Sequence, residues 1–563
     1  MKQFFKSIEI KKVAIFLLII SIGIFFRFIG INWDQGFHLH PDERFLTMVG
    51  IASKIPPDFF TYLNPSLSTL NPTNNNFSFF VYGIFPITLT KILALLLNFN
   101  SYNNFTLVGR FLSGYFDILT IIIIFLFTRD LELKTKIPRT TKYFASFAYS
   151  ITVFAIQLSH FFTVDIFLNF FMFASVYLAF HYMITDRFRF LILSPVFFGL
   201  AVASKVTALA VLPLILFFIL YPAFKKGRKI FSKLSLAEES LKIIFYIIIS
   251  YLLVRLADPY MFGSTNLFLP ILNQDFLKSL HQLMAYNSPE VWYPPNIQWI
   301  NKMPVIFALQ NIIFFGVGIP YFLLLILGFY KSLRKKQPIL FAILSWVFLM
   351  FLYQSVQFVK TMRYFIYLYP FFAIFTGIAL SNIYKKFPKL IFIIIPILLI
   401  WPLFFISIYI KPHSRVTASQ WIYQNLPNNS VILSEYWDDG LPLPIPGENK
   451  TFTTKEFPVF DIDTSQKWQT MDTMLQQGDY LILSSNRGWG SIPTVPNKYP
   501  QTSKFYADLF AGKLHYQKIA EFTSYPSLRY LGIPIDFPDG WAEEAFTVYD
   551  HPIVMIFKNM NHK

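Results

Sequence analysis

Long apolar runs recur along the 563-residue chain and are separated by short polar gaps. A helix needs about 20 apolar residues to cross a bilayer core, and most of these runs approach that length. We therefore predict eleven membrane spans, although two of them are short and leave the count between ten and twelve. The predicted spans are 13–31, 107–128, 143–161, 165–184, 190–204, 206–222, 243–257, 311–331, 338–357, 364–383 and 390–410.

Basic residues gather in the gaps between the apolar runs. Because cytoplasmic loops carry an excess of Lys and Arg, these clusters predict the orientation of the chain. They place the amino terminus in the cytoplasm and the carboxyl terminus outside, in a multi-pass protein of the plasma (inner) membrane. The clusters lie at 129–142, 187–189, 225–233, 334–336 and 385–389.

Two apolar runs need separate interpretation. The first run, 13–31, is long for a signal peptide and no small-residue cleavage site follows it, so we interpret it as a retained span. If the run 77–97 were a full crossing, the basic segment 129–142 would be placed outside. We therefore predict that 77–97 forms an interfacial or re-entrant pair of helices, interrupted at Pro86 and Lys91.

Composition supports a membrane protein and excludes other classes. Only 14% of the residues are charged and 55% are hydrophobic, whereas a soluble domain has about 25% charged residues. The net charge of +17 could indicate a nucleic-acid partner, but its placement in the gaps between spans argues against one. The chain has no cysteine, which excludes disulfide and thiol chemistry without identifying a compartment.

The hydrophobic pattern changes after Ile410. The segments "SVILSE" and "DYLILSS" predict buried strands, "SKFYADLFAG" predicts an amphipathic helix ended by glycine, and "YDHPIVMIFK" predicts a last strand. We therefore divide the chain into a membrane domain, 1–410, and an extracytoplasmic α/β domain, 411–563. The first outer loop, 33–106, would carry the interfacial helices.

Several ionisable residues fall at the predicted outer ends of the spans, and charges at membrane depth are costly enough to indicate function. Asp42 and Glu43 follow the first span directly. Structural explanations remain open: Asp42 could cap an interfacial helix, Asp165 could cap the fourth span, and the cations could reach toward lipid headgroups. The other residues of this set are His160, Asp258, Arg110, Asp165, Lys205, Lys360, Arg363 and Tyr364.

This set would suit a sugar joined through phosphate to a polyprenyl lipid. Cations from several spans would hold the phosphate, which is already a competent leaving group. One ionised carboxylate would accept the proton of an attacking hydroxyl. His38 and His40 lack convincing metal-ligand spacing, so we predict no metal or other cofactor, and a divalent ion stays open.

Five motifs in order resemble the bacterial branch of the protein O-mannosyltransferase and aminoarabinose transferase family, which is similar to glycosyltransferase family 39. They are "HPDERFL", "VGRFLSGYFDILT", "LSHFFTVDIFLNFF", "GLAVASKVTAL" and "KTMRYFIYLYPFFAI". The resemblance covers about 1–410 and implies the multi-spanning GT-C fold. It implies an inverting transfer of a sugar from a polyprenyl-phosphate donor to an acceptor hydroxyl at the outer face.

The resemblance also implies roles for single residues. Asp42 would be the catalytic base, with Glu43 supporting it, and Asp165 would be the second acid of the fold. The implied contacts to lipid phosphate or donor sugar are Arg110, Lys205, Lys360 and Arg363, with Tyr364 beside them. The region 411–563 does not match the outer repeats of eukaryotic members, which leaves the acceptor open among protein, lipid and glycan.

Two other functions remain alternatives. A transporter or flippase of lipid-linked sugars would use the charges to line a pathway, but such sites lie near the midplane and these charges gather at one face. A membrane scaffold or sensor would use its outer domain to bind a partner and would have catalytically inactive spans.

Overall fold

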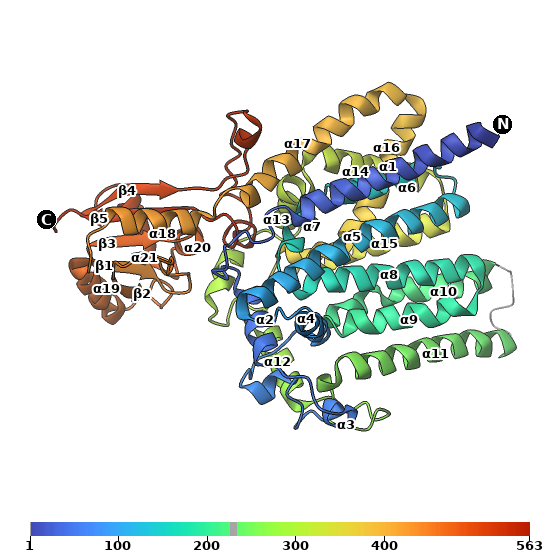
Figure 1. Cartoon of the computed structure of the whole chain (residues 1–563), viewed down its shortest axis with the longest axis horizontal. Helices are drawn as coiled ribbons and strands as arrows, with labels where there is room; N and C mark the ends of the chain where they lie inside the picture. Colours follow the sequence, from blue (N-terminus) through green and yellow to red (C-terminus); the bar gives the residue numbers. More distant parts are fainter. Residues whose placement is uncertain (1, 226–232, 563) are drawn as a thin grey trace.

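The structure, a computed structural model, describes residues 2–225 and 233–562. Most of the predicted basic cluster 225–233 therefore lies outside the described residues. A bundle of long helices carries a smaller strand-containing domain at one end, and the amino terminus lies at the opposite end of the bundle (Figure 1). We call the end that carries this domain the outer end. A mostly helical membrane domain followed by an α/β domain confirms the predicted fold class.

Seven helices of the described residues are long and apolar enough to cross a membrane. Each of them covers a predicted span. They are Tyr102–Lys134 (α5), Val164–Thr185 (α8), Val206–Ala223 (η2, Val206–Val211, with α10, Leu212–Lys225), Ala237–Ala257 (within α11, Lys233–Ala257), Pro338–Ser355 (α15), Met362–Lys386 (η6, Met362–Leu368, with α16, Tyr369–Lys386) and Pro388–Asn425 (η7, Pro388–Leu390; α17, Ile391–Ile410; α18, Ser414–Asn425).

The other four predicted spans are helical but shorter, broken or more polar. Helix α1 (Lys2–Phe28) carries Lys11, Lys12 and Arg27, and α9 (Phe188–Val202) has 15 residues. The predicted span 143–161 is split into α6 (Thr141–Ser150) and α7 (Val153–Ser159). The predicted span 311–331 bends by 112° between Ile306–Val317 (α13, Ile306–Asn311, and η5, Ile312–Val317) and α14 (Ile319–Arg334). The total of eleven spans therefore stays a prediction.

The first outer loop contains short helices, as predicted, but the region 77–97 differs in detail. It forms one helix, α4 (Phe85–Leu96), and not a pair. Figure 1 shows α4 nearly end-on while the long helices run across the picture, so α4 lies across them. Pro86 begins this helix and does not interrupt it, because proline is tolerated in a first helical turn. Lys91 is buried within it and donates to Asn100 at 2.9 Å. The loop's other helices are α2 (Pro41–Ala52), α3 (Phe59–Leu63) and η1 (Pro72–Asn75).

A second outer segment follows α11. It contains η3 (Pro259–Met261), α12 (Gln274–Ala285) and η4 (Pro294–Trp299). Its Ser279 contacts the first outer loop, because the Ser279 hydroxyl accepts a hydrogen bond from the amide of Phe80 at 3.3 Å. The two outer segments therefore lie together on the outer end of the bundle.

The carboxyl-terminal domain is built on a mixed five-stranded sheet of order β2-β1-β3-β5-β4. Strands β1, β2 and β3 run parallel, and β5 pairs antiparallel with β3 and β4. The predicted strands at "SVILSE", "DYLILSS" and "YDHPIVMIFK" are confirmed, as is the predicted helix. The bounds are Val431–Glu435 (β1), Thr453–Phe457 (β2), Tyr480–Leu483 (β3), Tyr516–Phe522 (β4), Val554–Asn559 (β5), Ser465–Gln477 (α19), Arg487–Ser491 (α20), Pro500–Phe510 (α21) and Glu544–Thr547 (α22).

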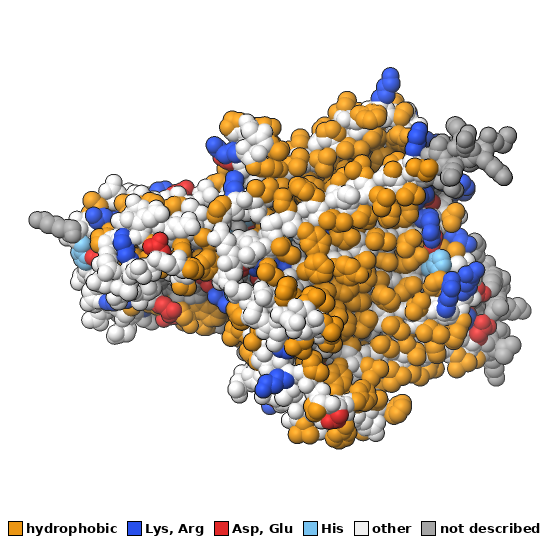
Figure 2. Space-filling view, viewed as in Figure 1, with side chains coloured by type: hydrophobic (Ala, Val, Ile, Leu, Met, Phe, Trp, Pro, Cys, Tyr) orange, Lys and Arg blue, Asp and Glu red, His pale blue; other side chains and the backbone are white. Residues whose placement is uncertain are grey.

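Hydrophobic side chains cover the visible face of the helical bundle (Figure 2). On the bundle as a whole, Phe341 of α15 and Phe392 of α17 are 63% and 81% exposed. The visible face of the carboxyl-terminal domain is mainly polar, and Lys and Arg gather at the end of the bundle far from it (Figure 2). A continuous apolar surface of this kind suits contact with lipid hydrocarbon.

A buried histidine ties the carboxyl-terminal domain to the bundle. His551 lies between Asp539 at 2.8 Å and Asp550 at 2.5 Å. Asp550 also accepts hydrogen bonds from Gln157 of α7 and Tyr409 of α17. Although burial acts to lower it, the two carboxylates raise the pKa of His551 to about 10.

The His551 cluster predicts a pH-dependent stability. Because its pKa is raised by folding, the stabilisation is complete below the unfolded pKa of about 6.5 and is lost as pH rises through about 10. His551→Gln should lower the unfolding temperature at pH 6, and the gap to the wild type should narrow toward pH 10. His515→Gln, at an exposed position, is the control. A gap that stays constant between pH 6 and 10 would contradict the charged imidazole.

Candidate active site at the outer end of the bundle

Four of the predicted site residues meet in one chain of ion pairs. The Arg363 guanidinium is paired with the Asp42 carboxylate and lies 3.6 Å from Asp165. Asp165 also accepts a hydrogen bond from the Lys205 ammonium at 2.8 Å. The order along the chain of contacts is therefore Asp42, Arg363, Asp165 and Lys205, with alternating charge.

The local structure explains why these residues meet. Asp42 and Asp165 lie in the first turns of α2 and α8, where the helix dipole favours a negative charge. Lys205 follows α9 and begins the break before η2, and Arg363 lies in η6, before α16. Each residue therefore lies where a helix begins or ends, and packing of these helices brings the four ends together.

The electrostatic setting favours an ionised Asp42. Burial acts to raise its pKa, but the nearby positive charges, Arg363 first among them, and the hydrogen bond from Arg363 together outweigh burial, and the pKa is about 2. The neighbouring His40, which is buried against Phe161 and Tyr549, has a pKa lowered by burial to about 4. At neutral pH the site therefore holds a carboxylate next to a neutral imidazole. His40 also caps α2, because its ring accepts a hydrogen bond from the Glu43 amide.

Aromatic side chains surround the ion pairs. The Lys205 ammonium lies 4.9 Å from the centre of the Tyr364 ring, and the Arg363 guanidinium lies 6.0 Å from it. Tyr82 and Tyr549 also lie within electrostatic range of Asp42 and Arg363, and burial raises the pKa of both hydroxyls. The sequence identified Tyr364 through its motif, but Tyr82 and Tyr549 stand in no motif that marks them.

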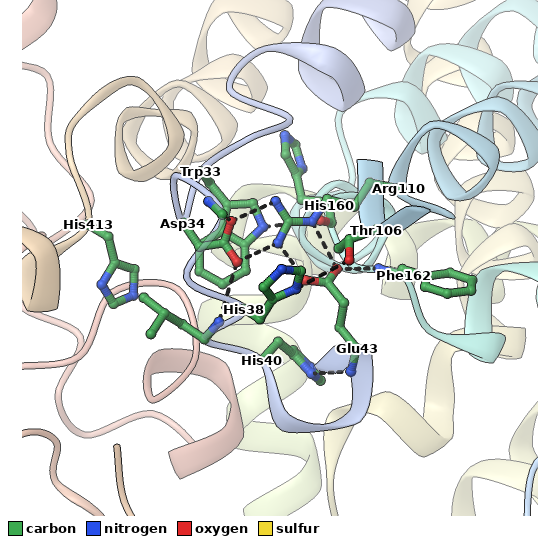
Figure 3. Close-up of polar contacts among 12 residues, drawn as sticks. Trp33, Asp34, His38, His40, Glu43, Thr106, Arg110, His160, Phe162 and His413 are labelled. Carbon is green, nitrogen blue, oxygen red and sulfur yellow. Dashed lines mark hydrogen bonds and ion pairs between the residues drawn. The ribbon is translucent and has the colours of Figure 1, made fainter. Parts of the chain in front are cut away.

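Glu43 and Arg110 belong to a separate buried cluster. Arg110 donates to both Glu43 oxygens at 2.9 and 2.5 Å, to both Asp34 oxygens at 3.0 and 2.8 Å, and to the Ile31 carbonyl (Figure 3). The Glu43 carboxylate also accepts a hydrogen bond from the Phe162 amide at 2.7 Å. Both residues are 1% exposed or less, so neither faces the ion pairs around Asp42 as a free side chain. The geometry favours a structural role over the predicted support of catalysis and phosphate binding.

The pKa values within this cluster move in opposite directions. Burial raises the pKa of Glu43 more than Arg110 lowers it. Burial also acts to raise the pKa of Asp34, but the charge and hydrogen bonds of Arg110, together with the Gly36 amide and the His38 charge, outweigh burial and lower this pKa. Two carboxylates therefore share one guanidinium.

Lys360 is separate from the ion pairs. Its ammonium donates to the Phe358 carbonyl at 2.9 Å, and burial lowers its pKa. Among the described residues it makes no ion pair with a carboxylate. The structure therefore does not join Lys360 to Asp42, although the two residues share the outer end.

A residue of the carboxyl-terminal domain fixes the segment before Arg363. The Glu543 carboxylate accepts hydrogen bonds from the Thr361 hydroxyl and from the Met362 amide, the latter at 2.7 Å. The Glu543 amide in turn donates to the Asn311 side chain at 2.8 Å. Burial raises the pKa of Glu543 to about 7. Sequence reasoning missed this residue, because "GWAEEAF" gives no signal that it lies near Arg363.

Among the described residues, no group of three or more His, Asp and Glu side chains is arranged to hold a metal ion. Asp42 and Asp165 are neutralised instead by Arg363 and Lys205. The charges within this site therefore balance through side chains.

Comparisons with known proteins show a partial family match and a shared fold. Residues 92–254 match the family described as dolichyl-phosphate-mannose-protein mannosyltransferase. A comparison with curated proteins finds no match. The fold is similar to that of the Archaeoglobus fulgidus oligosaccharyltransferase in complex with Zn and sulfate, with a TM-score of 0.50 and 14% identity over 97% of this chain and 88% of that chain. ArnT from Cupriavidus metallidurans bound to undecaprenyl phosphate aligns at a TM-score of 0.47 and 12% identity, over 96% of this chain and 97% of that chain.

The chain is a multi-pass membrane protein with a fold similar to that of the oligosaccharyltransferase, as the predicted fold class implies. The predicted resemblance to protein mannosyltransferases is confirmed over residues 92–254, which include Arg110, Asp165 and Lys205.

The Arg110 cluster generates a stability prediction. Arg110→Met leaves Glu43 and Asp34 buried without their cation, which should cost about 3–5 kcal/mol. Adding Glu43→Gln should recover part of the loss, because it removes one unpaired charge. Thermal unfolding of the protein in lipid nanodiscs measures both effects. Arg129→Met, at a 43% exposed side chain on the same helix, should change stability by less than about 1 kcal/mol. A stable Arg110→Met protein that cannot bind lipid phosphate would instead make Arg110 a ligand.

Proposed function

We propose that the protein transfers a sugar from a polyprenyl-phosphate donor to an acceptor hydroxyl, with Asp42 as the general base. The observation that carries this proposal is the chain of contacts among Asp42, Arg363, Asp165 and Lys205 at one end of the bundle. The family matched by residues 92–254 is described by a dolichyl-phosphate sugar, which supports a lipid-phosphate donor.

The lipid-phosphate donor fits the charges of the site. Arg363 and Lys205 can both bind phosphate oxygens, and a guanidinium does so with two parallel hydrogen bonds. Both cations lie beside helices whose outer surfaces are apolar, so a polyprenyl chain can remain in the bilayer while its phosphate reaches them. Asp165 contacts both cations, at 2.8 Å from Lys205 and 3.6 Å from Arg363, and so holds them close to each other.

In the proposed mechanism, Arg363 is paired with Asp42 until the donor binds. A donor phosphate competes with Asp42 for Arg363, and Asp42 is then free to accept a hydrogen bond from the acceptor hydroxyl. Asp42 takes the hydroxyl proton while the acceptor oxygen bonds to the anomeric carbon. The bond from that carbon to the phosphate oxygen breaks, and Arg363 and Lys205 stabilise the departing polyprenyl phosphate. Attack opposite the leaving group inverts the anomeric configuration.

The position of the charges argues against a transporter. A pathway through the membrane would place binding groups near the midplane. Two ionic residues buried within α1 and α5, Arg27 and Asp117, are paired with each other at 2.6 Å and are fully buried. The alternating ion pairs of the outer end suit a reaction at the membrane surface.

We also propose that the chain has the predicted orientation in the membrane. Lys and Arg gather at the end of the bundle opposite the carboxyl-terminal domain, which by the positive-inside rule supports a cytoplasmic position for that end. The active site and the carboxyl-terminal domain then face the outside of the plasma (inner) membrane.

Asp42→Asn tests the base directly. The variant should lose at least 100-fold in transfer from a synthetic polyprenyl-phosphate sugar, because general-base catalysis contributes about 10²–10⁴-fold. Donor binding should persist, since Arg363 and Lys205 remain. The assay is release of polyprenyl phosphate by purified protein in nanodiscs. Asp472→Asn, an exposed position on α19, is the matched control. Full turnover by Asp42→Asn would remove this residue from the mechanism.

Arg363→Gln tests the coupling between cation and base. Without the Arg363 charge, burial raises the pKa of Asp42 above its present value of about 2. Since the base must be ionised, the acidic limb of the kcat/KM profile should move to higher pH. The KM for the donor should rise as well, by about tenfold or more. Arg129→Gln, at the far end of α5, should change neither quantity. An unmoved acidic limb would show that Arg363 does not act on the base.

A further inference from the structure

A cavity of about 360 Å³ lies between the start of α2 and the carboxyl-terminal domain. Its volume is in the range of about 300–1,000 Å³ that is typical of small-molecule sites. The residues that line it come from both domains. They include Pro41 and Arg44 of the membrane domain and Tyr436, Trp437, Glu456 and Tyr549 of the carboxyl-terminal domain.

The cavity adjoins the proposed base. Pro41, in its wall, directly precedes Asp42 in the chain. Tyr549, also in its wall, lies 4.2 Å from the His40 ring, measured between ring centres, and within electrostatic range of Asp42. The wall of the cavity therefore comes within one residue of Asp42, although Asp42 itself does not line it.

The fold makes this position suitable for a ligand. In open α/β sheets, ligands bind outside the carboxyl ends of the parallel strands. Strand β1 ends at Glu435, and the cavity residues Tyr436, Trp437 and Asp438 follow it directly. Glu456, near the end of β2, contributes from the neighbouring strand. The domain therefore turns the ligand-binding edge of its sheet toward Asp42.

The arginines of the cavity are neutralised by protein carboxylates. Arg415 binds Asp438 at 2.5 Å and Asp439 at 2.7 Å, and Arg44 also binds Asp439, at 3.1 Å. The third arginine in the wall, Arg487, binds Glu544 at 2.7 Å. The Arg415 and Arg487 side chains are 1% and 11% exposed in these pairs, whereas Arg363 is 23% exposed beside Asp42, so a phosphate or carboxylate ligand would displace the cavity pairs less readily. The arrangement favours a neutral ligand that can both donate and accept hydrogen bonds.

Two features provide for such a ligand. Glu456 is exposed and makes no ion pair with another described residue, so its oxygens can accept hydrogen bonds from hydroxyls. Tyr436, Trp437 and Tyr549 add aromatic surface, which packs against the apolar faces of sugar rings while the hydroxyls reach polar groups. The cavity thus combines flat aromatic surfaces with carboxylate acceptors.

The conformation of Trp437 supports a binding role. Its φ is +73°, in the left-handed region that a bulky residue rarely adopts. Arg487 holds this conformation by donating to the Trp437 carbonyl at 2.6 Å, and the ring packs at 5.7 Å against Tyr293. Strained residues that are held by their surroundings occur frequently at ligand clamps.

We propose that this cavity is the acceptor site and that the acceptor is a neutral carbohydrate residue of a glycan. The inference rests on the proposed function and adds the class of acceptor to it. A sugar ring lies against the aromatic side chains, Glu456 orients its hydroxyls, and one hydroxyl faces Asp42. The carboxyl-terminal domain thereby supplies the acceptor half of the site, while the membrane domain supplies the donor half.

The test compares acceptors with full-length protein in nanodiscs. The glycan probes are mannotriose, cellotriose, chitotriose and xylotriose, and the competing probes are a Ser/Thr-rich peptide and a vesicle of anionic lipid. Binding is measured by saturation-transfer NMR. Donor hydrolysis by water is measured separately, because it requires Asp42, Arg363 and Lys205 but no acceptor.

We expect at least one glycan to bind, with the affinity lowered tenfold or more in Tyr436→Ala and in Glu456→Gln. Tyr436 is 39% exposed and Glu456 is also exposed, so both variants should fold. Glu448→Gln, on the same domain and outside the cavity, should bind as the wild type does. Donor hydrolysis should be unchanged in Glu448→Gln.

Other outcomes would overturn the acceptor assignment. These are binding of the peptide or lipid while no glycan binds, the absence of glycan binding altogether, or glycan binding that is unaffected in both cavity variants. If the wild type still hydrolyses the donor in an Asp42-dependent way, each of these results overturns the acceptor assignment alone and spares the proposed function. If the wild type itself fails to cleave any lipid-phosphate sugar in an Asp42-dependent way, the proposed function fails instead.

Discussion

The structure of the outer end depends on one buried guanidinium. Arg110 reaches from α5 into the first outer loop and binds Asp34, Glu43 and the Ile31 carbonyl at once. Burying these charges is costly, so the cluster contributes little net stability compared with an apolar core. Its effect is specificity, because only one path of the loop satisfies all three contacts. That path sets the start of α2 and hence the position of Asp42.

The two domains form a single site at the outer end. The bundle provides Asp165, Lys205 and Arg363, all at helix ends, while Glu543 of the carboxyl-terminal domain holds the two residues before Arg363. The carboxyl-terminal segment that contains Glu543 continues through Tyr549 to the buried His551 cluster. Asp550 of that cluster is hydrogen-bonded to Gln157 of α7 and to Tyr409 of α17. Movement of the carboxyl-terminal domain would therefore be transmitted to the cation that pairs with Asp42.

The sequence predicted the helical class, the outer domain and the grouping of Asp42, Asp165, Lys205 and Arg363, because helix ends on one side of a membrane must lie near one another. It could not predict the partner of each charge. Adjacent residues of one helix turn, Asp42 and Glu43, point to different clusters, and only the packing of α5 decides which carboxylate Arg110 takes. The sequence also could not predict that Glu543 binds the residues before Arg363, because this contact depends on how the carboxyl-terminal domain packs against η6.

In the proposed mechanism, the charge balance of the site explains how Asp42 can serve as a base although it is strongly ionised. Asp42 and Asp165 together offset Arg363 and Lys205, so the site is neutral before the donor binds, and Asp42 is a weak base with a pKa of about 2. A donor phosphate adds negative charge and draws Arg363 away from Asp42. Like charges nearby raise the pKa of a carboxylate, so donor binding strengthens the base. Proton abstraction is thereby favoured only when the sugar to be transferred is already in place.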